Sequence, residues 1–340
     1  MSADHKPERV LVTGATGFVG QAFCQWLLDL GHVVTALGRR AIFPLPLSHP
    51  NFTYHSIDFQ KKDEQNETLL ASLMQGVDVV VHLAARVHHL KETGMQQLSA
   101  YQEINVDVTQ RVAKAAVNAS VKRFVYLSTI KVLGEKTIGS PFRAEDHPRP
   151  QDAYSVSKLQ AEKILQEECR RSGMEWVIIR PPLIYGLAAK GNFKRLLNLS
   201  KTCLPLPFRT IRNRRSLVSL ENLCSFIACC VSHPHARGEV FLVSDNHDLS
   251  TAELIKTMRK IQSKWAKLFP FPIGLLKLLG CLAGRRREVD RLIDSLQLNI
   301  EKSMRLLEWQ PPMTPEKSLS GLLDQKRAAC EHAQAAPILP

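Results

Sequence analysis

The sequence predicts an α/β protein with a Rossmann-type, doubly wound parallel sheet, for two reasons. Short apolar runs alternate with helical patterns along the first half of the chain, which is the order typical of a parallel sheet covered by helices. The first run, 9–13, passes directly into a turn with three glycines and then into an apolar-periodic helix. A second apolar run at 32–37 follows this helix, and the four pieces together form one βαβ unit.

Composition restricts the classes of partner that the chain is expected to have. The net charge of +13 is spread along 340 residues rather than set in one stripe with aromatic side chains, so we expect no nucleic acid and favour small polyanions. The eight cysteines form no C-x-x-C pair and no zinc-type spacing, so we expect reduced thiols and no metal site. No secretory signal and no membrane-spanning run is evident, and we therefore expect a cytoplasmic protein.

The glycine turn, 14–20, has the spacing G-x-x-G-x-x-G. One glycine permits the tight turn, one lets backbone amides approach a pyrophosphate, and one allows close packing of helix on strand. The start of the helix then faces the negative charge. We therefore expect a dinucleotide to contact residues of this turn, namely Gly14, Thr16, Gly17, Phe18, Val19 and Gly20.

Arg39 and Arg40 follow the second strand, where an NAD site usually places an acidic residue against the ribose 2′-hydroxyl. A guanidinium suits a 2′-phosphate. The cofactor is therefore NADP or NAD, with NADP favoured, and the alternative is a pair of solvated arginines at a strand end.

Further strands are expected at 52–57, 77–83, 124–127 and 176–180, with helices at 64–74, 105–119 and from 154 onward. Ligands of such sheets bind beyond the carboxyl ends of the strands. The residues expected there near the cofactor are Leu83, Ala84, Ala85, Ser128, Thr129 and Pro181.

A tyrosine and a lysine, Tyr154 and Lys158, stand four residues apart at the start of a helical segment. This spacing places both side chains on one helix face. A phenol titrates near ~10, and a neighbouring cation lowers that pKa. The pair therefore predicts an acid/base group, with Lys158 expected to depress the pKa of Tyr154.

These motifs, in this order, resemble the extended branch of the short-chain dehydrogenase/reductase superfamily, which includes the nucleotide-sugar epimerases, dehydratases and reductases. The resemblance covers residues 8 to about 320. It implies that Tyr154 is the acid/base, that Lys158 holds the nicotinamide ribose, and that Thr129 bonds the reacting oxygen. It further implies that Asp58 contacts the adenine, and that Asn192 and Arg215 bind the substrate's diphosphate, with Lys131 at a common substrate position.

The chain departs from the family pattern at Val108, Leu133 and Lys131. Within the branch it looks most like a subgroup from bacterial surface-polysaccharide (lipopolysaccharide) pathways. The resemblance then implies a 4-keto reductase of a UDP-N-acetyl-amino-6-deoxy sugar (UDP-N-acetylquinovosamine type). The alternative is a 4-epimerase of UDP-glucose, UDP-N-acetylglucosamine or a lipid-linked sugar. A non-catalytic dinucleotide-binding regulator is a remote alternative.

The expected domain boundaries lie where the regular alternation of strands and helices stops. We expect residues 8–182, with returning segments near 217–245, to bind the dinucleotide, and 183–216 with 246–325 to form a smaller substrate-binding portion. Residues 326–340 read as a frayed tail. The apolar, basic stretch 268–287 predicts a lid helix, with peripheral membrane contact as the alternative. A homodimer through the helices near 96–119 and 153–172 is implied by the family.

Overall fold

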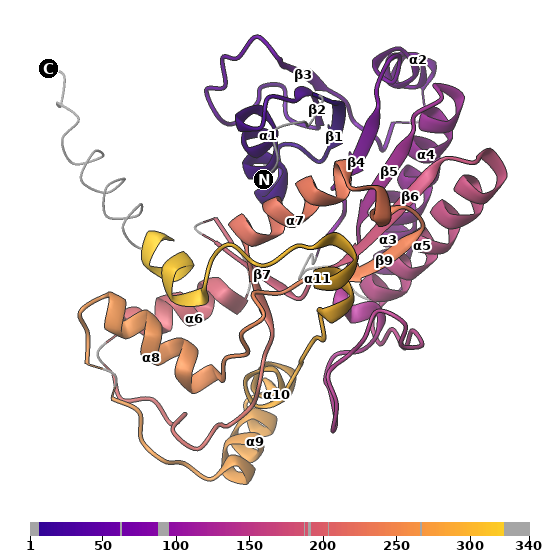
Figure 1. Cartoon of the computed structure of the whole chain (residues 1–340). Coiled ribbons are helices and arrows are strands. Elements are labelled where there is room, and N and C mark those ends of the chain that lie inside the picture. The colour runs from indigo at the N-terminus through magenta and orange to yellow at the C-terminus, as the bar shows by residue number, and fades with distance from the viewer. Residues whose placement is uncertain are drawn as a thin grey trace, which may run out of the picture.

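A parallel sheet of seven strands forms the centre of the molecule in the computed structural model (Figure 1). The structure describes residues 7–61, 63–87, 95–186, 188–189, 192–202, 204–265 and 267–322. The strand order is β3-β2-β1-β4-β5-β6-β9. The bounds are β1 Arg9–Thr13, β2 Val33–Gly38, β3 Phe52–Ser56, β4 Val79–His82, β5 Arg123–Leu127, β6 Glu175–Arg180 and β9 Glu239–Leu242. The predicted fold class is confirmed.

The chain changes direction between two neighbouring strands, β1 and β4. From β1 the order runs outward through β2 and β3, and from β4 it runs the other way. Thr13 lies beside His82 in the register of this pair, so both carboxyl ends open onto the same crevice. Ligands of doubly wound sheets bind at such a switch point.

Both faces of the sheet are covered, as the continuously apolar strands require. Side chains of β1 alternate between two cores, with Val10 and Val12 on one face and Leu11 on the other. The first face carries α1 (Phe18–Asp29), α7 (Leu220–Ser232) and α11 (Glu301–Leu307). The second carries α2 (Glu64–Leu73), α4 (Val108–Asn118) and α5 (Ala153–Ser172).

The prediction of one continuous helix over 105–119 is wrong at its start. The structure divides this region into α3 (Met95–Tyr101), a π-helix η1 (Gln102–Asp107) and α4. A π-helical turn holds one extra residue per turn and turns the following side chains to a new face, and such turns often occur at functional sites. Asn105, within η1, is fully buried.

The rest of the chain packs beyond the carboxyl side of the sheet (Figure 1). A two-stranded sheet, β7 (Leu183–Tyr185) with β8 (Leu217–Ser219), connects it to the larger sheet's layers. Its helices include α6 (Asn192–Lys201), α8 (Thr251–Ile261), α9 (Ile273–Leu282) and α10 (Arg286–Ile293), and residues 315–322 are also helical. Short 3₁₀ turns, η2 (Ile130–Val132) and η3 (Pro234–Ala236), lie elsewhere. The sequence predicted no helix at α6, where the stretch reads as irregular.

Most of the cysteines in the described ranges lie in the core. Among the described residues, Cys24, Cys169, Cys224 and Cys230 are free and buried, whereas Cys281 is exposed. No helix in the described ranges combines the length and apolar character needed to cross a bilayer.

Candidate active site

The glycine turn joins β1 to α1 and leaves little room for side chains. Gly14 has φ of +68°, and a Cβ added there would lie 2.6 Å from the backbone nitrogen of Ala84. A Cβ on Gly20 would lie 2.3 Å from the Gly14 carbonyl oxygen. Gly17 is the N-cap of α1 and supplies no capping side chain. Glycine is therefore required for the turn and for its packing, and the helix start remains open to an anion.

The other predicted residues of this region form the rim of the same crevice. The Thr16 side chain would meet a Cβ placed on Gly38, Phe18 packs against Gly186, and Val19 is half-buried. Leu83 donates its amide to the Thr13 carbonyl at 3.2 Å, and Ala84 donates to Thr13 Oγ1 at 3.3 Å. Because backbone and small side chains line this rim, the turn and the end of β4 fit a dinucleotide pyrophosphate.

The arginines expected to select the cofactor follow β2 and are exposed. Arg39 donates to Gln60 Oε1 at 3.4 Å, and the backbone carbonyl of Arg40 accepts from the Tyr54 hydroxyl. Asp58 Oδ1 accepts from the Gln60 amide at 3.2 Å, so Arg39 and Asp58 lie around one short loop. A cofactor's adenosine end would lie against this loop.

Tyr154 lies in the first turn of α5, which begins with a capping box. Asp152 accepts from the Ser155 amide at 2.7 Å, and the Ser155 hydroxyl receives the Asp152 amide at 3.1 Å. The Tyr154 ring centroid lies 5.9 Å from that of Tyr101. Burial, and then the charges of Asp152 and Tyr101, raise the pKa of Tyr154. The prediction that Lys158 lowers the pKa of Tyr154 is therefore wrong, because the net shift of that pKa is upward.

The surroundings of Lys158 explain why it does not lower the pKa of Tyr154. Lys158 is 1% exposed, and its Nζ lies over the ring of Tyr126, 4.0 Å from the centroid. Burial lowers the pKa of Lys158 to about 7, with the charge of Glu162 opposing that shift. Near neutral pH the lysine is thus only partly charged, because desolvation disfavours the ammonium.

A chain of buried hydrogen bonds connects the cofactor crevice to η1. His82 Nδ1 lies 2.7 Å from Thr13 Oγ1, and His82 Nε2 lies 3.1 Å from Thr109 Oγ1. Because the Thr109 hydroxyl donates to the Asn105 carbonyl at 2.7 Å, His82 must donate through Nε2 and accept through Nδ1. Burial, and then the charge of Lys158, lower the pKa of His82 to about 3, so the ring is neutral.

From Asn105 the chain continues to the helix that carries the tyrosine. Asn105 Nδ2 donates to Ser157 Oγ at 2.9 Å, and the Ser157 hydroxyl donates to the Tyr154 carbonyl at 2.8 Å. Asn105 Oδ1 accepts from the Arg86 amide at 2.8 Å, which fixes the chain just after Ala85. The network thus connects the switch-point strands to the first turn of α5.

A buried ion pair holds the next turn of that helix. Glu162 is 2% exposed, and its carboxylate accepts from Arg180 NH2 at 2.6 Å and from Nε at 3.0 Å. The Ser128 hydroxyl also donates to Glu162, so this predicted cofactor contact is engaged with the helix through its side chain. Residues 154, 158 and 162 stand at intervals of four, which signals that all three lie on one helix face.

Three other residues of the predicted site, Thr129, Lys131 and Pro181, lie in or beside the short turn η2. Thr129 is 8% exposed and starts η2, where its Oγ1 accepts from the Lys131 amide at 3.3 Å. The Pro181 carbonyl accepts from the Ile130 amide at 2.9 Å. Lys131 Nζ pairs with Asp152 Oδ2 at 2.6 Å and with Glu135 Oε1 at 2.9 Å. Thr129 therefore adjoins the start of α5 through Lys131.

The two predicted diphosphate ligands lie farther along the chain. Arg215 is half-buried, and its NH1 donates to the carbonyls of Arg291 and Asp294 at 2.9 and 3.0 Å. Asn192 begins α6, and its side chain lies outside the described residues. That Arg215 and Asn192 bind a diphosphate remains a prediction.

Together, a glycine turn at the switch point and a Tyr-x-x-x-Lys helix beside it define a dinucleotide-dependent enzyme of the Rossmann class. A family model described as the NAD dependent epimerase/dehydratase family matches residues 10–244. A relative from Vibrio cholerae, UDP-glucose 4-epimerase, is 40% identical over 91% of this chain and 92% of its own. The chain belongs to the NAD dependent epimerase/dehydratase family.

Two more distant matches are a curated relative and a solved structure. An N-acetyl-alpha-D-glucosaminyl-diphospho-ditrans,octacis-undecaprenol 4-epimerase from Escherichia coli O157:H7 is 28% identical over 79% of this chain and 77% of its own. The crystal structure of a UDP-glucuronic acid 4-epimerase from Bacillus cereus in complex with NAD superposes with a TM-score of 0.74. It has 23% identity and covers 94% of this chain and 99% of the other.

Proposed function

We propose that the protein is a 4-epimerase of a UDP-linked hexose. The proposal is carried by one observation, that Tyr154, Lys158 and Thr129 occur together on a chain 40% identical to a UDP-glucose 4-epimerase over 91% of its length. The Escherichia coli relative also has a 4-epimerase name, which supports the same position on the sugar.

The chemistry assigns a separate task to each side chain. The bound dinucleotide supplies a hydride acceptor that can also return the hydride. Tyr154 takes the proton of the C4 oxygen and gives it back, and Thr129 donates a hydrogen bond to that oxygen. Lys158 binds the cofactor ribose. Positioned acid/base groups contribute typically ~10²–10⁴-fold, and the remaining acceleration comes from holding C4 in reactive geometry.

The substrate portion comprises 183–216 and 246–325, and its tasks are orientation and selection. Arg215, half-buried against the end of α10, presents a cation for a diphosphate. Asn192, at the start of α6, would contribute a second contact. A diphosphate is common to UDP and to lipid carriers, so these two contacts would not distinguish between the carriers.

A second candidate is the 4-keto reductase of a UDP-N-acetyl-amino-6-deoxy sugar. It is favoured by Arg39 and Arg40, which follow β2 where a 2′-phosphate would lie. NADPH is the usual reductant for net reduction, whereas an epimerase returns its own hydride. The NADP preference is tested with Arg39→Ala, which should weaken NADPH binding at least about tenfold more than NADH binding, since it removes one phosphate contact.

Assembly and location complete the proposal. We expect a cytoplasmic homodimer through α4 and α5 with the preceding α3, where Leu98 and Val156 are exposed at 52% and 37%. Light scattering of the wild type beside Leu98→Glu/Val156→Glu measures it, and a monomeric wild type contradicts it.

The function is tested by incubating purified protein with UDP-glucose and with UDP-N-acetylglucosamine, without added cofactor, and reading the products by NMR. A C4-inverted sugar supports the epimerase. Turnover only of a UDP-4-keto-6-deoxy sugar with added NADPH supports the reductase. Tyr154→Phe should abolish either activity while dinucleotide binding persists, and undiminished turnover in that variant rejects the site.

A further inference from the structure

The helix α9 directs its apolar face away from the protein. Leu275, Leu278, Leu279 and Leu282 are exposed at 43%, 54%, 48% and 77%. Their spacing, i, i+3, i+4 and i+7, places them along one side of the helix. We call these four residues the leucine stripe. An amphipathic helix normally buries such a stripe in its own core, so here the stripe is available to something outside the described chain.

The orientation of α9 is fixed by its opposite face. Leu276 packs into the cluster formed by Leu206, Phe208, Ile211 and Ile255. Gly280 is buried, and a Cβ there would lie 2.5 Å from Val289 Cγ2 of α10. Because Leu276 and Gly280 are one turn apart and both held, rotation of the helix to hide the stripe would break these contacts.

Basic residues are frequent near the stripe in the sequence. Residues 254–287 include nine lysines and arginines and no aspartate or glutamate. Of these, Arg259 is buried, and Arg285 and Arg286 lie 3.8 and 3.9 Å from Glu288 and Asp290 of α10. Lys277 lies on α9 itself, and Arg285, Arg286 and Arg287 follow its end and are exposed. A surface with this distribution is complementary to an anionic partner.

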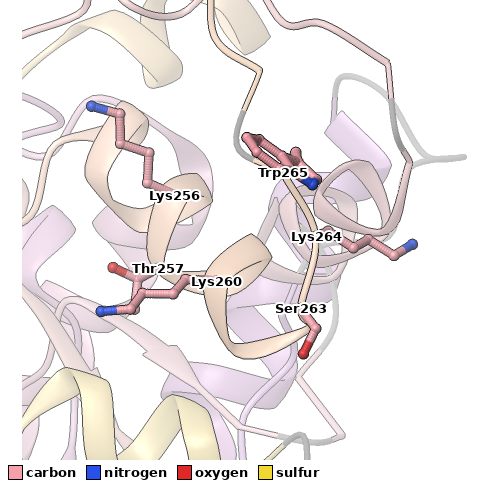
Figure 2. A pocket seen from close by; sticks show the side chains of 6 residues that line it. All are labelled: Lys256, Thr257, Lys260, Ser263, Lys264 and Trp265. Atoms are coloured by element: carbon pink, nitrogen blue, oxygen red, sulfur yellow. The ribbon is translucent and has the colours of Figure 1, made fainter.

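A second group of basic residues lines a pocket at the end of α8. The pocket has a volume of about 510 Å³ and lies over the end of α8 and the residues after it (Figure 2). Three lysines contribute to its lining, Lys256, Lys260 and Lys264. Trp265 stands beside them and is 85% exposed. Tryptophan and lysine together are typical of segments at the level of lipid head groups.

The position of α9 suits contact with a flat surface. Helices α9 and α10 form the end of the molecule remote from the seven-stranded sheet (Figure 1). A helix of ten residues is about 15 Å long, and no described helix is long and apolar enough to cross a bilayer. Contact therefore places α9 in the plane of an interface.

We propose that the leucine stripe, together with the exposed Arg285, Arg286 and Arg287 that follow α9, forms a docking surface for the anionic face of a lipid bilayer. The leucines enter the boundary between head groups and acyl chains, and the cations bind the lipid phosphates. Four leucines without a polar group among them provide no directional contact for an acidic protein, whereas a bilayer requires none. This inference does not depend on the sugar reaction proposed above.

Sedimentation of the full-length protein with vesicles tests the proposal. The expected result is binding to vesicles of equimolar phosphatidylglycerol and phosphatidylcholine at least about tenfold stronger than to phosphatidylcholine alone, weakening as salt rises toward about 0.5 M. The variant Leu278→Glu/Leu282→Glu should lose at least about tenfold of that binding. The matched control, Ile42→Glu/Ile138→Glu, alters two isoleucines that are 80% and 83% exposed on other parts of the surface, and should bind as the wild type does.

Three results overturn the proposal. The first is wild-type protein that remains in the supernatant or binds neutral vesicles equally well. The second is equal binding by the stripe variant and the control variant. The third is a dimer that becomes monomeric only in the stripe variant, measured by light scattering, which assigns the stripe to a second copy of the chain. Unchanged melting temperatures of both variants establish that either outcome concerns the surface and not folding.

Discussion

Lys131 Nζ lies 2.6 Å from Asp152 Oδ2, and Asp152 is the residue that caps the helix bearing Tyr154. The same carboxylate raises the pKa of Tyr154, whereas the pKa of Asp152 is itself held at about 2, where burial is outweighed by hydrogen bonds from Lys131 and Ser155. Lys131 thus compensates a charge two residues from the proposed acid/base group, Tyr154, and this connects a departure from the family pattern to the proposed catalysis.

Replacing Lys131 with methionine should slow turnover and move its pH dependence. Without the ammonium, the Asp152 charge acts fully on Tyr154, which disfavours the phenolate and raises the pKa further. The rate on the acid side should fall about tenfold for each unit of that rise. The rate-against-pH profile of Lys131→Met beside Lys131→Arg measures the effect.

The double variant Lys131→Met/Asp152→Asn is the internal control. The asparagine amide retains an oxygen that can accept the Ser155 amide but carries no charge, so activity should recover toward the wild type. If the double variant is as slow as Lys131→Met alone, the lysine acts through its bulk or through substrate contact instead.

Stability at mildly acidic pH should depend on His82. Its pKa is lowered to about 3 by burial, whereas an unfolded histidine titrates near ~6.5. The unfolded state therefore binds more protons between these values, and stability is lost as pH falls below the unfolded pKa. Between pH 7 and pH 5 this loss amounts to about 2 kcal/mol.

Urea unfolding of the wild type and His82→Gln at both pH values measures that term. Glutamine keeps hydrogen-bonding groups at the position but cannot gain a proton. The variant should be less stable at pH 7 because the network is less well matched, and its loss on acidification should be smaller by about 2 kcal/mol. Parallel losses in both proteins would show that His82 is not the group that titrates.

The sequence predicts the glycine turn and the shared helix face of Tyr154 and Lys158 well, and the buried contacts around them poorly. Gly14 and Gly20 act within a few residues of chain, so their spacing alone indicates the turn. Tyr154 and Lys158 share a helix face for the same local reason. The buried hydrogen-bonding groups around them come from other elements: His82 from β4, and Asn105 from η1, whose side chain donates to Ser157 beside Lys158.

Two failures have a physical cause that composition does not show. Tyr154 and Lys158 are expected to interact directly, but burial places the ammonium over Tyr126, a residue that is distant in sequence. Asn105 falls in a π-helix, and an apolar period does not reveal one extra residue in a turn. Glu162 could have been predicted from the sequence, because it continues the four-residue spacing of Tyr154 and Lys158 on the same helix face.

The ion pair between Glu162 and Arg180 should be costly to break from one side. Both side chains are buried, at 2% and 5% exposed, so Arg180→Met leaves an unpaired carboxylate beside Ser128. Removing one partner of such a pair costs about 3–5 kcal/mol. Chemical denaturation should show this loss in Arg180→Met, and a smaller loss in Arg180→Met/Glu162→Leu. Equal losses in the two variants would mean that packing, and not charge, dominates.

The Gly14 turn allows backbone strain and steric exclusion to be separated. Gly14 and Gly31 have φ of +68° and +82°, but only at Gly14 would a Cβ meet other atoms, the nearest being Ala84 N at 2.6 Å. Alanine at either position incurs the left-handed backbone penalty of roughly 1–2 kcal/mol. Gly14→Ala must in addition push β1 and the end of β4 apart, which widens the crevice that the dinucleotide enters.

Calorimetric titration with NAD and NADP should show lost binding in Gly14→Ala and near-normal binding in Gly31→Ala, although both variants melt at a lower temperature than the wild type. If Gly14→Ala binds the dinucleotide as tightly as Gly31→Ala does, close approach of the two loops is not what holds the cofactor.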